Sequence, residues 1–413
     1  MKKTYLLTVP IIILCAFILS GCVIHISKKD EDKNQDESAN VTIEAASFGK
    51  AGFAVDTEDA SYFWEFTSDD FSEGALWGNY EQSENSPVNL VCRTHDGQVK
   101  TVLSTEYAGT FAVTDKGIFY NNNDGFIVFV DPYSQTEKDT GIDAIILGIS
   151  SDGKYLIVRM FQNNQNIGLY SIDTSDYSAT EIHGTCDFLT IHNDIVYYSP
   201  YVEDYEKSRQ GMVELCRSSI DGKDKYLICQ TEPDLYDYDA FGYGCSIAQM
   251  RFSDDSIYFS YGCIAGTGFF YQGGKIVKVN YDGSGMETIA GANGNLVGSE
   301  FEIDKDGNII SLSSTEAYHE DMAEYYLDES SILWYDKNTG KAENVSSYYP
   351  DENYYSSSPQ YITVTDKHVY FITHYSENDP ENAVGWREYY VRKKSVFYVV
   401  DRKTKEIVTS YEF

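Results

Sequence analysis

The chain has 413 residues, which is enough for two or three ordinary domains or for one long all-β domain. It holds 31 Lys and Arg residues against 65 Asp and Glu residues, and a formal net charge of −34 repels nucleic acid, which excludes a DNA- or RNA-binding function. With 42% hydrophobic and 15% aromatic residues, including 36 Tyr, the sequence can build a large core and is not disordered throughout.

The first 21 residues have the organisation of a secretory signal peptide. Lys2 and Lys3 precede an apolar run at 5–19, which is shorter than the ~20 residues that span a bilayer as a helix. The run ends in Leu19-Ser20-Gly21-Cys22, which resembles the lipobox of bacterial lipoproteins. The resemblance implies cleavage before Cys22 and diacylation of its thiol, a palmitate-type anchor to the extracytoplasmic side of the cell membrane. An uncleaved anchor with an incidental cysteine is the alternative.

The segment after Cys22 is expected to be a flexible tether. Residues 27–40 (SKKDEDKNQDESAN) contain no aliphatic side chain larger than Ala and are dense in charge, so they cannot bury enough surface to fold. We therefore predict a signal peptide at 1–21, a lipidated and acidic linker at 22–45, and a folded domain at 46–413.

The rest of the chain repeats a two-part pattern seven times. Apolar segments that end at an Asp turn lie at 90–97, 127–132, 169–173, 214–222, 275–283, 332–336 and 396–401, each followed by a short alternating segment. Each is preceded by a separate hairpin, at 53–66, 111–120, 148–158, 189–198, 251–260, 301–312 and 361–372. Because Asp-Gly between alternating apolar residues is a strong hairpin signal, each pair of hairpins predicts one four-stranded antiparallel unit.

Seven such units suit a closed β-propeller, since one small sheet cannot bury its own faces. GISSDGKYLIV at 148–158 resembles TolB-like propeller repeats, and KIVKVNYDGSGMETIAG at 275–291 resembles low-density-lipoprotein-receptor-like ones. The resemblance covers residues 50–413 and implies the fold alone, because propellers host unrelated functions. We predict an all-β fold, a single β-propeller of seven four-stranded blades, with residues 41–46 (VTIEAA) as a candidate extra strand of the last blade. A pair of β-sandwiches is the alternative.

Six cysteines lie in the repeat region, and an exported protein permits disulfides. Cys216 and Cys229 flank the turn at 221–224 symmetrically, so we expect them to face each other across a hairpin at disulfide distance. Two buried free thiols are the alternative. Cys245 and Cys263, on consecutive segments of one unit, are a second pair with less direct support.

No motif indicates catalysis, a metal or a cofactor. Residues 268–274 have the glycine spacing of a P-loop start without the Lys-Ser/Thr that contacts phosphate and metal. Residues 304–308 resemble half of a calcium loop, but glycine is at the wrong position, so we interpret them as a hairpin turn. We assign no catalytic residue, no metal ligand and no cofactor.

The predicted connections differ in length at the two ends of each blade, whose strands we name A to D. The A–B and C–D turns are short, whereas the B–C and D–A connections, which open on the other face, include the long segments 67–88, 200–211, 231–247, 261–274, 314–331, 347–360 and 375–394. These hold 24 acidic, 24 aromatic and six basic residues.

Long loops on a rigid scaffold commonly carry function, and aromatic rings and carboxylates suit a cationic peptide or a glycan. The alternative is that these residues only solubilise the insertions. The candidate ligand-binding residues are Trp77, Tyr236, Tyr238, Tyr243, Phe269, Phe270, Tyr271, Tyr325, Tyr326, Tyr354, Tyr355 and Trp386.

The sequence favours a membrane-anchored extracytoplasmic binding protein for a protein, peptide or glycan partner over an enzyme. An enzyme that acts on envelope polysaccharide, as a lyase or a glycoside hydrolase, is one alternative, with Glu316, Glu320 or Asp237 as acid and base. A scaffold for the assembly of other envelope proteins is another.

The lipobox yields a direct test. Replacing Cys22 with Ala removes the thiol that would be acylated, so the protein is expected to leave the membrane fraction or to stay unprocessed. Metabolic labelling with a fatty acid and membrane fractionation measure this. Continued acylation of C22A contradicts the assignment, and C92A is the matched control that should stay anchored.

Overall fold

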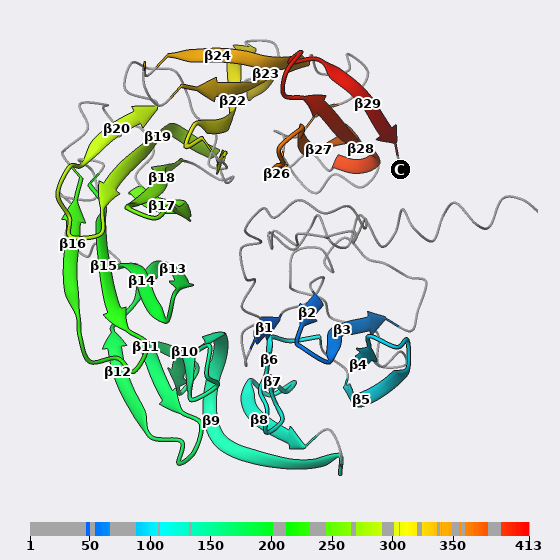
Figure 1. Cartoon of the computed structure of the whole chain (residues 1–413), viewed down its shortest axis with the longest axis vertical. Helices are drawn as coiled ribbons and strands as arrows, with labels where there is room; N and C mark the ends of the chain where they lie inside the picture. Colours follow the sequence, from blue (N-terminus) through cyan, green and yellow to red (C-terminus); the bar gives the residue numbers. More distant parts are fainter. Residues whose placement is uncertain are drawn as a thin grey trace, which may run out of the picture. The chain divides into compact units, whose positions relative to one another are not determined.

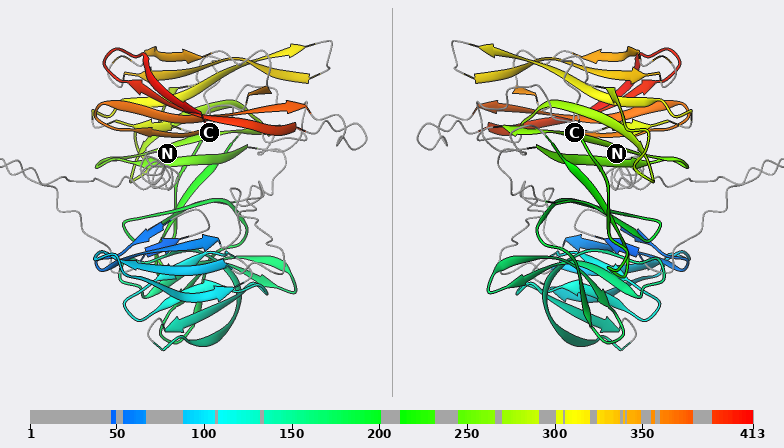
Figure 2. Two further views of the ribbon diagram at one scale, coloured as in Figure 1. Left: turned by 90° about the vertical axis from the view of Figure 1, so that its right-hand side faces the viewer. Right: turned by 90° about the vertical axis from the view of Figure 1, so that its left-hand side faces the viewer.

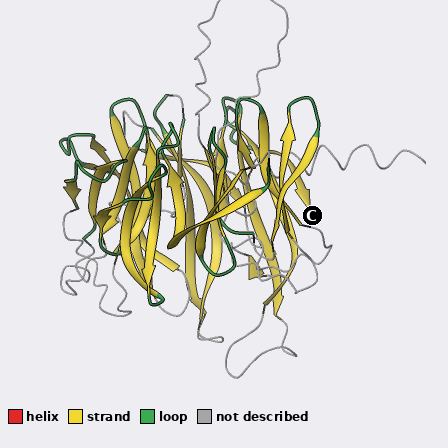
Figure 3. Ribbon diagram, turned by 90° about the horizontal axis from the view of Figure 1, so that it is seen from below, coloured by secondary structure: helices red, strands yellow, loops and turns green. Residues whose placement is uncertain are grey.

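The computed structural model is built from β-strands and turns, and no helix occurs among the residues it describes (Figure 3). These residues are 47–49, 54–66, 88–105, 108–131, 134–200, 212–231, 245–265, 270–290, 301–304, 306–319, 324–336, 339, 341–348, 355–356, 360–378 and 390–412. The chain forms two compact units, which we describe separately: unit 1 holds 1–186, 191–197 and 217–226, and unit 2 holds the remainder.

The first strands of the chain build unit 1 (Figure 1). They are β1 (Ser47–Gly49), β2 (Ala54–Asp56), β3 (Ala60–Phe66), β4 (Val88–Thr94), β5 (Val99–Thr105), β6 (Phe111–Val113), β7 (Ile118–Asn121), β8 (Phe126–Asp131), β9 (Thr136–Ile149), β10 (Tyr155–Gln162), β11 (Gln165–Asp173) and β12 (Ala179–His183). The next sheet has residues in both units and consists of β13 (Cys186–His192), β14 (Ile195–Pro200), β15 (Glu214–Ser219) and β16 (Tyr226–Gln230).

The remaining strands belong to unit 2. They are β17 (Cys245–Phe252), β18 (Ser256–Ala265), β19 (Phe270–Asn280), β20 (Glu287–Ala290), β21 (Phe301–Ile303), β22 (Ile309–His319), β23 (Glu324–Tyr335), β24 (Ala342–Tyr348), β25 (Tyr355–Ser356), β26 (Gln360–Val364), β27 (His368–Asn378), β28 (Tyr390–Asp401) and β29 (Ile407–Glu412).

Within the described residues these strands form seven four-stranded antiparallel meanders, the blade type of β-propellers, and this confirms the predicted fold class. In chain order, blades 1 to 7 are β2–β5, β6–β9, β9–β12, β13–β16, β17–β20, β21–β24 and β26–β29. Blades 2 and 3 share the uninterrupted strand β9: its residues 136–143 pair with β8, and its residues 144–149 pair with β10. The predicted extra strand at 41–46 lies outside the described residues, and the neighbouring strand β1 pairs with β6 of blade 2.

Blades 2 and 6 contribute buried residues to a core on each of their two faces. In unit 1, Ile118 and Tyr120 of β7 join a cluster with Leu90 of blade 1, while Phe119 between them joins a cluster with Leu156 of blade 3. In unit 2, Ile309 packs toward blade 5 and its neighbour Ile310 toward blade 7. Because successive side chains of a strand point to opposite faces, one apolar run fills two inter-blade cores.

The C–D turns come in two forms that share one backbone feature. In blades 4 and 5 an Asp-Gly turn places Gly222 and Gly283 at φ of 78° and 85°. Blades 2, 3 and 7 use a longer turn that starts at an Asp and places Gln135, Tyr177 and Lys405 at φ of 56–63°. Each of these five residues has a left-handed backbone conformation, with φ between 56° and 85°, and we call them latch residues.

All five latch residues contact the D strand of the preceding blade. Gln135 donates through Nε2 to the Thr101 carbonyl of β5 at 3.2 Å, and the Lys138 ammonium of β9 lies 4.7 Å from the centre of the Tyr177 ring. Gly222 and Gly283 lie so close to the preceding blade that a Cβ added there would be 3.0 Å from Thr180 of β12 and 2.0 Å from the Ile228 carbonyl oxygen of β16. Lys405 forms an ion pair with Glu343 of β24. The latch residues therefore connect consecutive blades along their outer strands.

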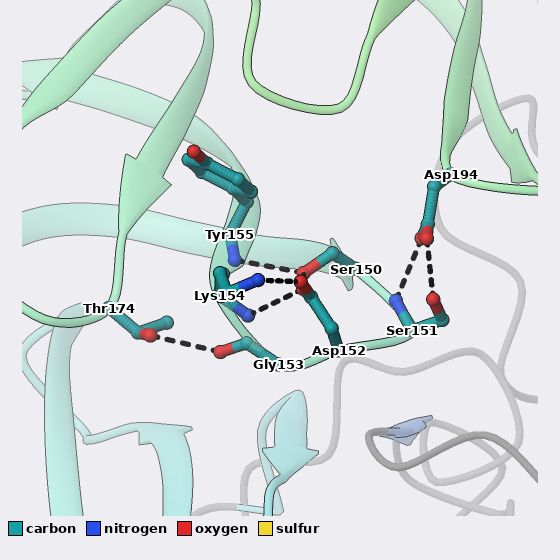
Figure 4. Close-up of polar contacts among 8 residues, drawn as sticks. All are labelled: Ser150, Ser151, Asp152, Gly153, Lys154, Tyr155, Thr174 and Asp194. Atoms are coloured by element: carbon teal, nitrogen blue, oxygen red, sulfur yellow. Dashed lines mark hydrogen bonds and ion pairs between the residues drawn. The ribbon is translucent and has the colours of Figure 1, made fainter.

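Two polar clusters each connect the A–B turn of one blade to a turn of a neighbouring blade. In unit 1, Asp194 of blade 4 accepts hydrogen bonds from the Ser151 backbone N–H at 2.7 Å and its hydroxyl at 2.5 Å, beside the exposed Asp152–Lys154 ion pair (Figure 4). In unit 2, Asp304 of blade 6 forms an ion pair with Arg402 of blade 7 at 2.7 Å, and their side chains are 0% and 8% exposed.

The residues that resemble half of a calcium loop are thus a turn held by a buried ion pair. The Asp304 carboxylate accepts bonds from the backbone N–H groups of Asp306 and Asn308 and from the Asn308 amide. Arg402 also donates to the Thr365 carbonyl at 2.8 Å and lies 5.0 Å from the centre of the Trp334 ring. The carboxylate is saturated by protein donors, which confirms the hairpin-turn interpretation.

Replacing Gly283 with Ala is expected to destabilise the protein strongly. A Cβ at this position would lie 2.0 Å from the Ile228 carbonyl oxygen, a backbone atom that cannot move aside without shifting β16. Gly125 has the same φ of +85° but only a distant contact at 3.8 Å, so G125A carries the left-handed strain alone, about 1 kcal/mol. We expect G283A to cost at least ~2 kcal/mol more than G125A in urea unfolding, as overpacking does. Equal costs would contradict the latch contact.

Removing the charge of Arg402 is expected to cost far more than removing an exposed one. R402M keeps much of the aliphatic stem but leaves the Asp304 carboxylate buried and unpaired, which should lower the free energy of unfolding by about 3–5 kcal/mol. Lys154, 67% exposed at its side chain, is the control, and K154M should leave the free energy of unfolding nearly unchanged because solvent screens its ion pair. A small effect of R402M in chemical denaturation would show that the ion pair is dispensable.

Candidate functional site

Three consecutive blades of unit 2 carry long B–C hairpins. They are β18–β19 in blade 5, β22–β23 in blade 6 and β27–β28 in blade 7, and Figure 2 shows β22 and β23 (yellow to orange) as one long twisted ribbon. The bond between Asp304 and Arg402 puts the short turns of blades 6 and 7 at one end, so their B–C hairpins lie at the other. The described residues of the predicted loops 261–274, 314–331 and 375–394 are therefore strand, a correction to the sequence interpretation: these are 261–265, 270–274, 314–319, 324–331, 375–378 and 390–394.

Each long hairpin is interrupted by a β-bulge where the blade body ends. In β23 the extra residue is Asp328, because Thr315 pairs with Glu329 and Glu316 with Leu327. In β28 it is Lys393. Bulges bend a strand and increase its twist, so the paired residues beyond each bulge form a separate two-stranded arm. We call these arms the hairpin extensions: 263–265 with 270–272, 316–319 with 324–327, and 376–378 with 390–392.

The bulge in blade 5 explains the glycine-rich segment of the sequence. Tyr261 pairs with Lys275 and Cys263 with Gln272, so Gly262 of β18 faces Gly273 and Gly274 of β19. Glycine suits such irregular backbone because it has no Cβ. The spacing that resembles a P-loop start therefore belongs to a strand irregularity.

Packed side chains hold the base of the extensions. Tyr261 and Tyr375, the last paired residues before the bulges of blades 5 and 7, are each only 4% exposed. The Tyr375 hydroxyl lies 2.8 Å from that of Tyr398, and the Lys394 ammonium lies 5.1 Å from the Tyr375 ring centre. The extensions of blades 5 and 7 thus continue directly from buried residues of the blade bodies.

The register also identifies which residues of the extensions share a face. In blade 6, Tyr318 lies directly opposite Tyr325, on the same face as Glu316, while Tyr326 and Glu324 are on the other face. Directly opposite residues of a strand pair are neighbours on one face of the sheet. The three extensions contain six aromatic residues (Phe270, Tyr271, Tyr318, Tyr325, Tyr326 and Tyr390) and three Glu, against one Arg.

Five of the predicted ligand-binding residues fall on described backbone. Phe270 and Tyr271 lie in β19, Tyr325 and Tyr326 in β23, and Tyr355 in β25, where it pairs with Ser376 of the blade 7 extension. The others lie outside the described residues: Trp77, Tyr236, Tyr238, Tyr243, Phe269, Tyr354 and Trp386. The sequence analysis did not select Tyr318 and Tyr390, although the β-propensity of their segments continues past the blade body.

Cys216 and Cys229 lie on the neighbouring strands β15 and β16 as free thiols, 9% and 8% exposed. Burial raises the pKa of Cys216 to about 11 and that of Cys229 to about 12, with smaller contributions from Glu214 and from Cys216 respectively. Their disulfide stays a prediction. Among the described side chains, no group of three or more His, Cys, Asp and Glu could hold a metal ion.

Comparisons with known proteins identify distant structural similarity only. No protein-family profile matches the sequence, and no curated protein matches it. A puromycin-hydrolysing peptidase of Mycobacterium tuberculosis is similar over 86% of this chain, with 10% identity and a TM-score of 0.41, and the chain spans 51% of that peptidase. The propeller domain of the trilobed protease of Pyrococcus furiosus is similar over 89% of this chain and 98% of its own, with 10% identity and a TM-score of 0.38.

An oligogalacturonate lyase of Vibrio parahaemolyticus is similar over 85% of this chain and 84% of its own, with 12% identity and a TM-score of 0.36. All of these scores are low, so the fold assignment rests on the strand order and register described above. The chain is an all-β protein of the β-propeller class. No helix in its described part is long and apolar enough to cross a membrane.

The buried thiols are expected to be inert in the native protein. Because the pKa of each is raised, the reactive thiolate is scarce at pH 8 and becomes more abundant only as the pH rises toward 11 and 12. Alkylation with iodoacetamide, followed by peptide mass spectrometry, should label the half-buried Cys92 well before either. Faster labelling of Cys216 than of Cys92 would contradict the burial.

Proposed function

We propose that this protein is a lipid-anchored, extracytoplasmic binding module that holds a protein, peptide or glycan ligand on the hairpin extensions of blades 5 to 7. The observation that carries the proposal is the occurrence of three bulged extensions in consecutive blades of one unit. One elongated hairpin is a common irregularity, but three neighbouring ones with the same design indicate a shared task.

The chemistry of the extensions supports binding. Tyrosine and phenylalanine offer large flat surfaces and lose little side-chain entropy when a ligand covers them. Glu316, Glu324 and Glu377 add carboxylates that accept hydrogen bonds from hydroxyl or ammonium groups. Strands present these groups more rigidly than irregular loops would, which lowers the cost of ordering on binding.

The N-terminal sequence supports the location. The lipobox-like segment at 19–22 would anchor the chain through diacylated Cys22, and the charged tether at 27–40 would hold the folded part away from an envelope surface. The acidic body is repelled by an anionic membrane, so its working surface is expected to face an external partner rather than the bilayer.

Two alternatives to a binding module are an enzyme and an assembly scaffold, and an enzyme needs a particular arrangement of carboxyl groups. A glycosidase requires two carboxyl groups at a defined separation, and of the three candidates Glu316 lies in the blade 6 extension while Glu320 and Asp237 lie outside the described residues. Turnover of envelope polysaccharides by the purified protein would favour the enzyme, and capture of envelope proteins without glycan or peptide binding would favour the assembly scaffold.

A double substitution in the blade 6 extension tests the proposal. Y318A/Y325A removes the cross-strand aromatic pair, and since a central stacking residue contributes about 2 kcal/mol, binding should weaken by roughly tenfold or more. A glycan array and a panel of cationic peptides serve as probes. Tyr226, 39% exposed on the outer strand β16, is the matched aromatic control.

The salt dependence of binding distinguishes a cationic peptide from a neutral glycan as the ligand. A cationic peptide should bind more weakly as salt rises from 50 to about 500 mM because charges at separations beyond a few ångströms are screened, whereas a neutral glycan should be unaffected. Equal weakening by Y226A and by Y318A/Y325A would place the binding surface elsewhere.

A further inference from the structure

Blade 5 brings two cysteines to one register position. Cys245 is the first residue of β17, and its direct partner in the antiparallel pair with β18 is Cys263. Directly opposite residues of antiparallel strands have Cα atoms about 4.5 or 5.5 Å apart, and both separations fall within the ~4.4–6.8 Å that disulfides bridge. The two residues also share a face of the sheet, because cross-strand partners do.

This pair lies where the body of blade 5 ends and its hairpin extension begins. Cys263 is the first paired residue beyond the bulge of β18, and the extension continues from it as two strands only, β18 and β19. Cys245 marks the end of the three-stranded region, since β17 begins there. A covalent link at this point would fix the base of the extension to strand A of the blade.

We propose that Cys245 and Cys263 form a disulfide that fastens the blade 5 extension to the blade body. A thiolate of one cysteine attacks a disulfide donor, such as oxidised glutathione or a thiol oxidoreductase, and releases one donor thiolate. The second cysteine attacks the mixed disulfide and releases the other. Two electrons pass from the cysteine pair to the donor, and the two thiol protons end on the donor thiols.

Three of the four other described cysteines, Cys92, Cys216 and Cys229, are less suited to this chemistry. Cys92 lies opposite Tyr62 and Lys100 in its sheet. Cys216 and Cys229 are neighbours, but both are buried, so a donor has little access to them in the folded protein.

Peptide mapping of the full chain tests the proposal and does not depend on its cellular location. The purified protein is equilibrated in oxidised and reduced glutathione, denatured, alkylated with iodoacetamide and digested, with and without prior reduction. The expected result is a linked peptide that joins Cys245 to Cys263 and disappears on reduction, with Cys92 alkylated in both samples.

Single substitutions give the controls. In C245S, Cys263 should become alkylated without reduction, whereas C216S should leave the Cys245–Cys263 link intact. The proposal is overturned if Cys245 and Cys263 are both alkylated in the oxidised wild-type protein, or if the linked peptide joins Cys216 to Cys229 instead.

Amide hydrogen exchange tests whether the disulfide restrains the blade 5 extension. Reduction of the wild-type protein should speed amide exchange at 263–272, and C245S should show the fast rate under both conditions. An intact disulfide with unchanged exchange would refute the fastening role, while the absence of a disulfide would leave the proposed binding function untouched.

Discussion

The structure depends on apolar contacts between the faces of consecutive blades. The run Ile118-Phe119-Tyr120 in β7 is buried throughout, and its alternate members fill two different cores. A four-stranded sheet with two apolar faces cannot be stable in water by itself, so the stability of each blade is largely an interface property. This constraint also explains why the inner strands are apolar along their length instead of alternating.

The outer strands of consecutive blades are connected by single contacts of the latch residues. A left-handed residue in each of five C–D turns contacts the preceding blade, and the residue type follows the space available. Where the preceding backbone comes close, as Ile228 does, only glycine fits, and where it lies farther away a side chain such as Gln135 or Lys405 spans the gap. The two turn types in the sequence are thus two solutions to one geometric problem.

The sequence was sufficient for the fold because turn chemistry is local. Asp-Gly pairs and Asp-initiated turns mark the hairpins, and all seven blades could be predicted from them. The joined strand β9 was not predicted, because the continuity of blades 2 and 3 is a property of pairing: Asn121 holds the crossing point through hydrogen bonds to Ala144 and Ile146.

The candidate site was predicted less completely. The extensions 316–319 with 324–327 and 376–378 with 390–392 lie beyond the bulges of their blades, and their segments resemble loops in the sequence because they lack apolar alternation. That Tyr318 faces Tyr325 depends on the extra residue Asp328, which shifts the register by one position and cannot be recognised without the partner strand. Cys245 and Cys263 are likewise direct partners only because of the bulge in β17 between Ile247 and Gln249.

The latch contacts have a consequence for how the chain is made. A polypeptide emerges from its N-terminus, yet the D strand of blade 4 acquires its contact with Gly283 only when the third strand of blade 5 has been synthesised and has turned. The same delay applies to β5, β9, β12 and β24, so assembly trails synthesis by about one blade. During translation, the most recently synthesised of these blades is therefore the one whose D strand still lacks its latch contact.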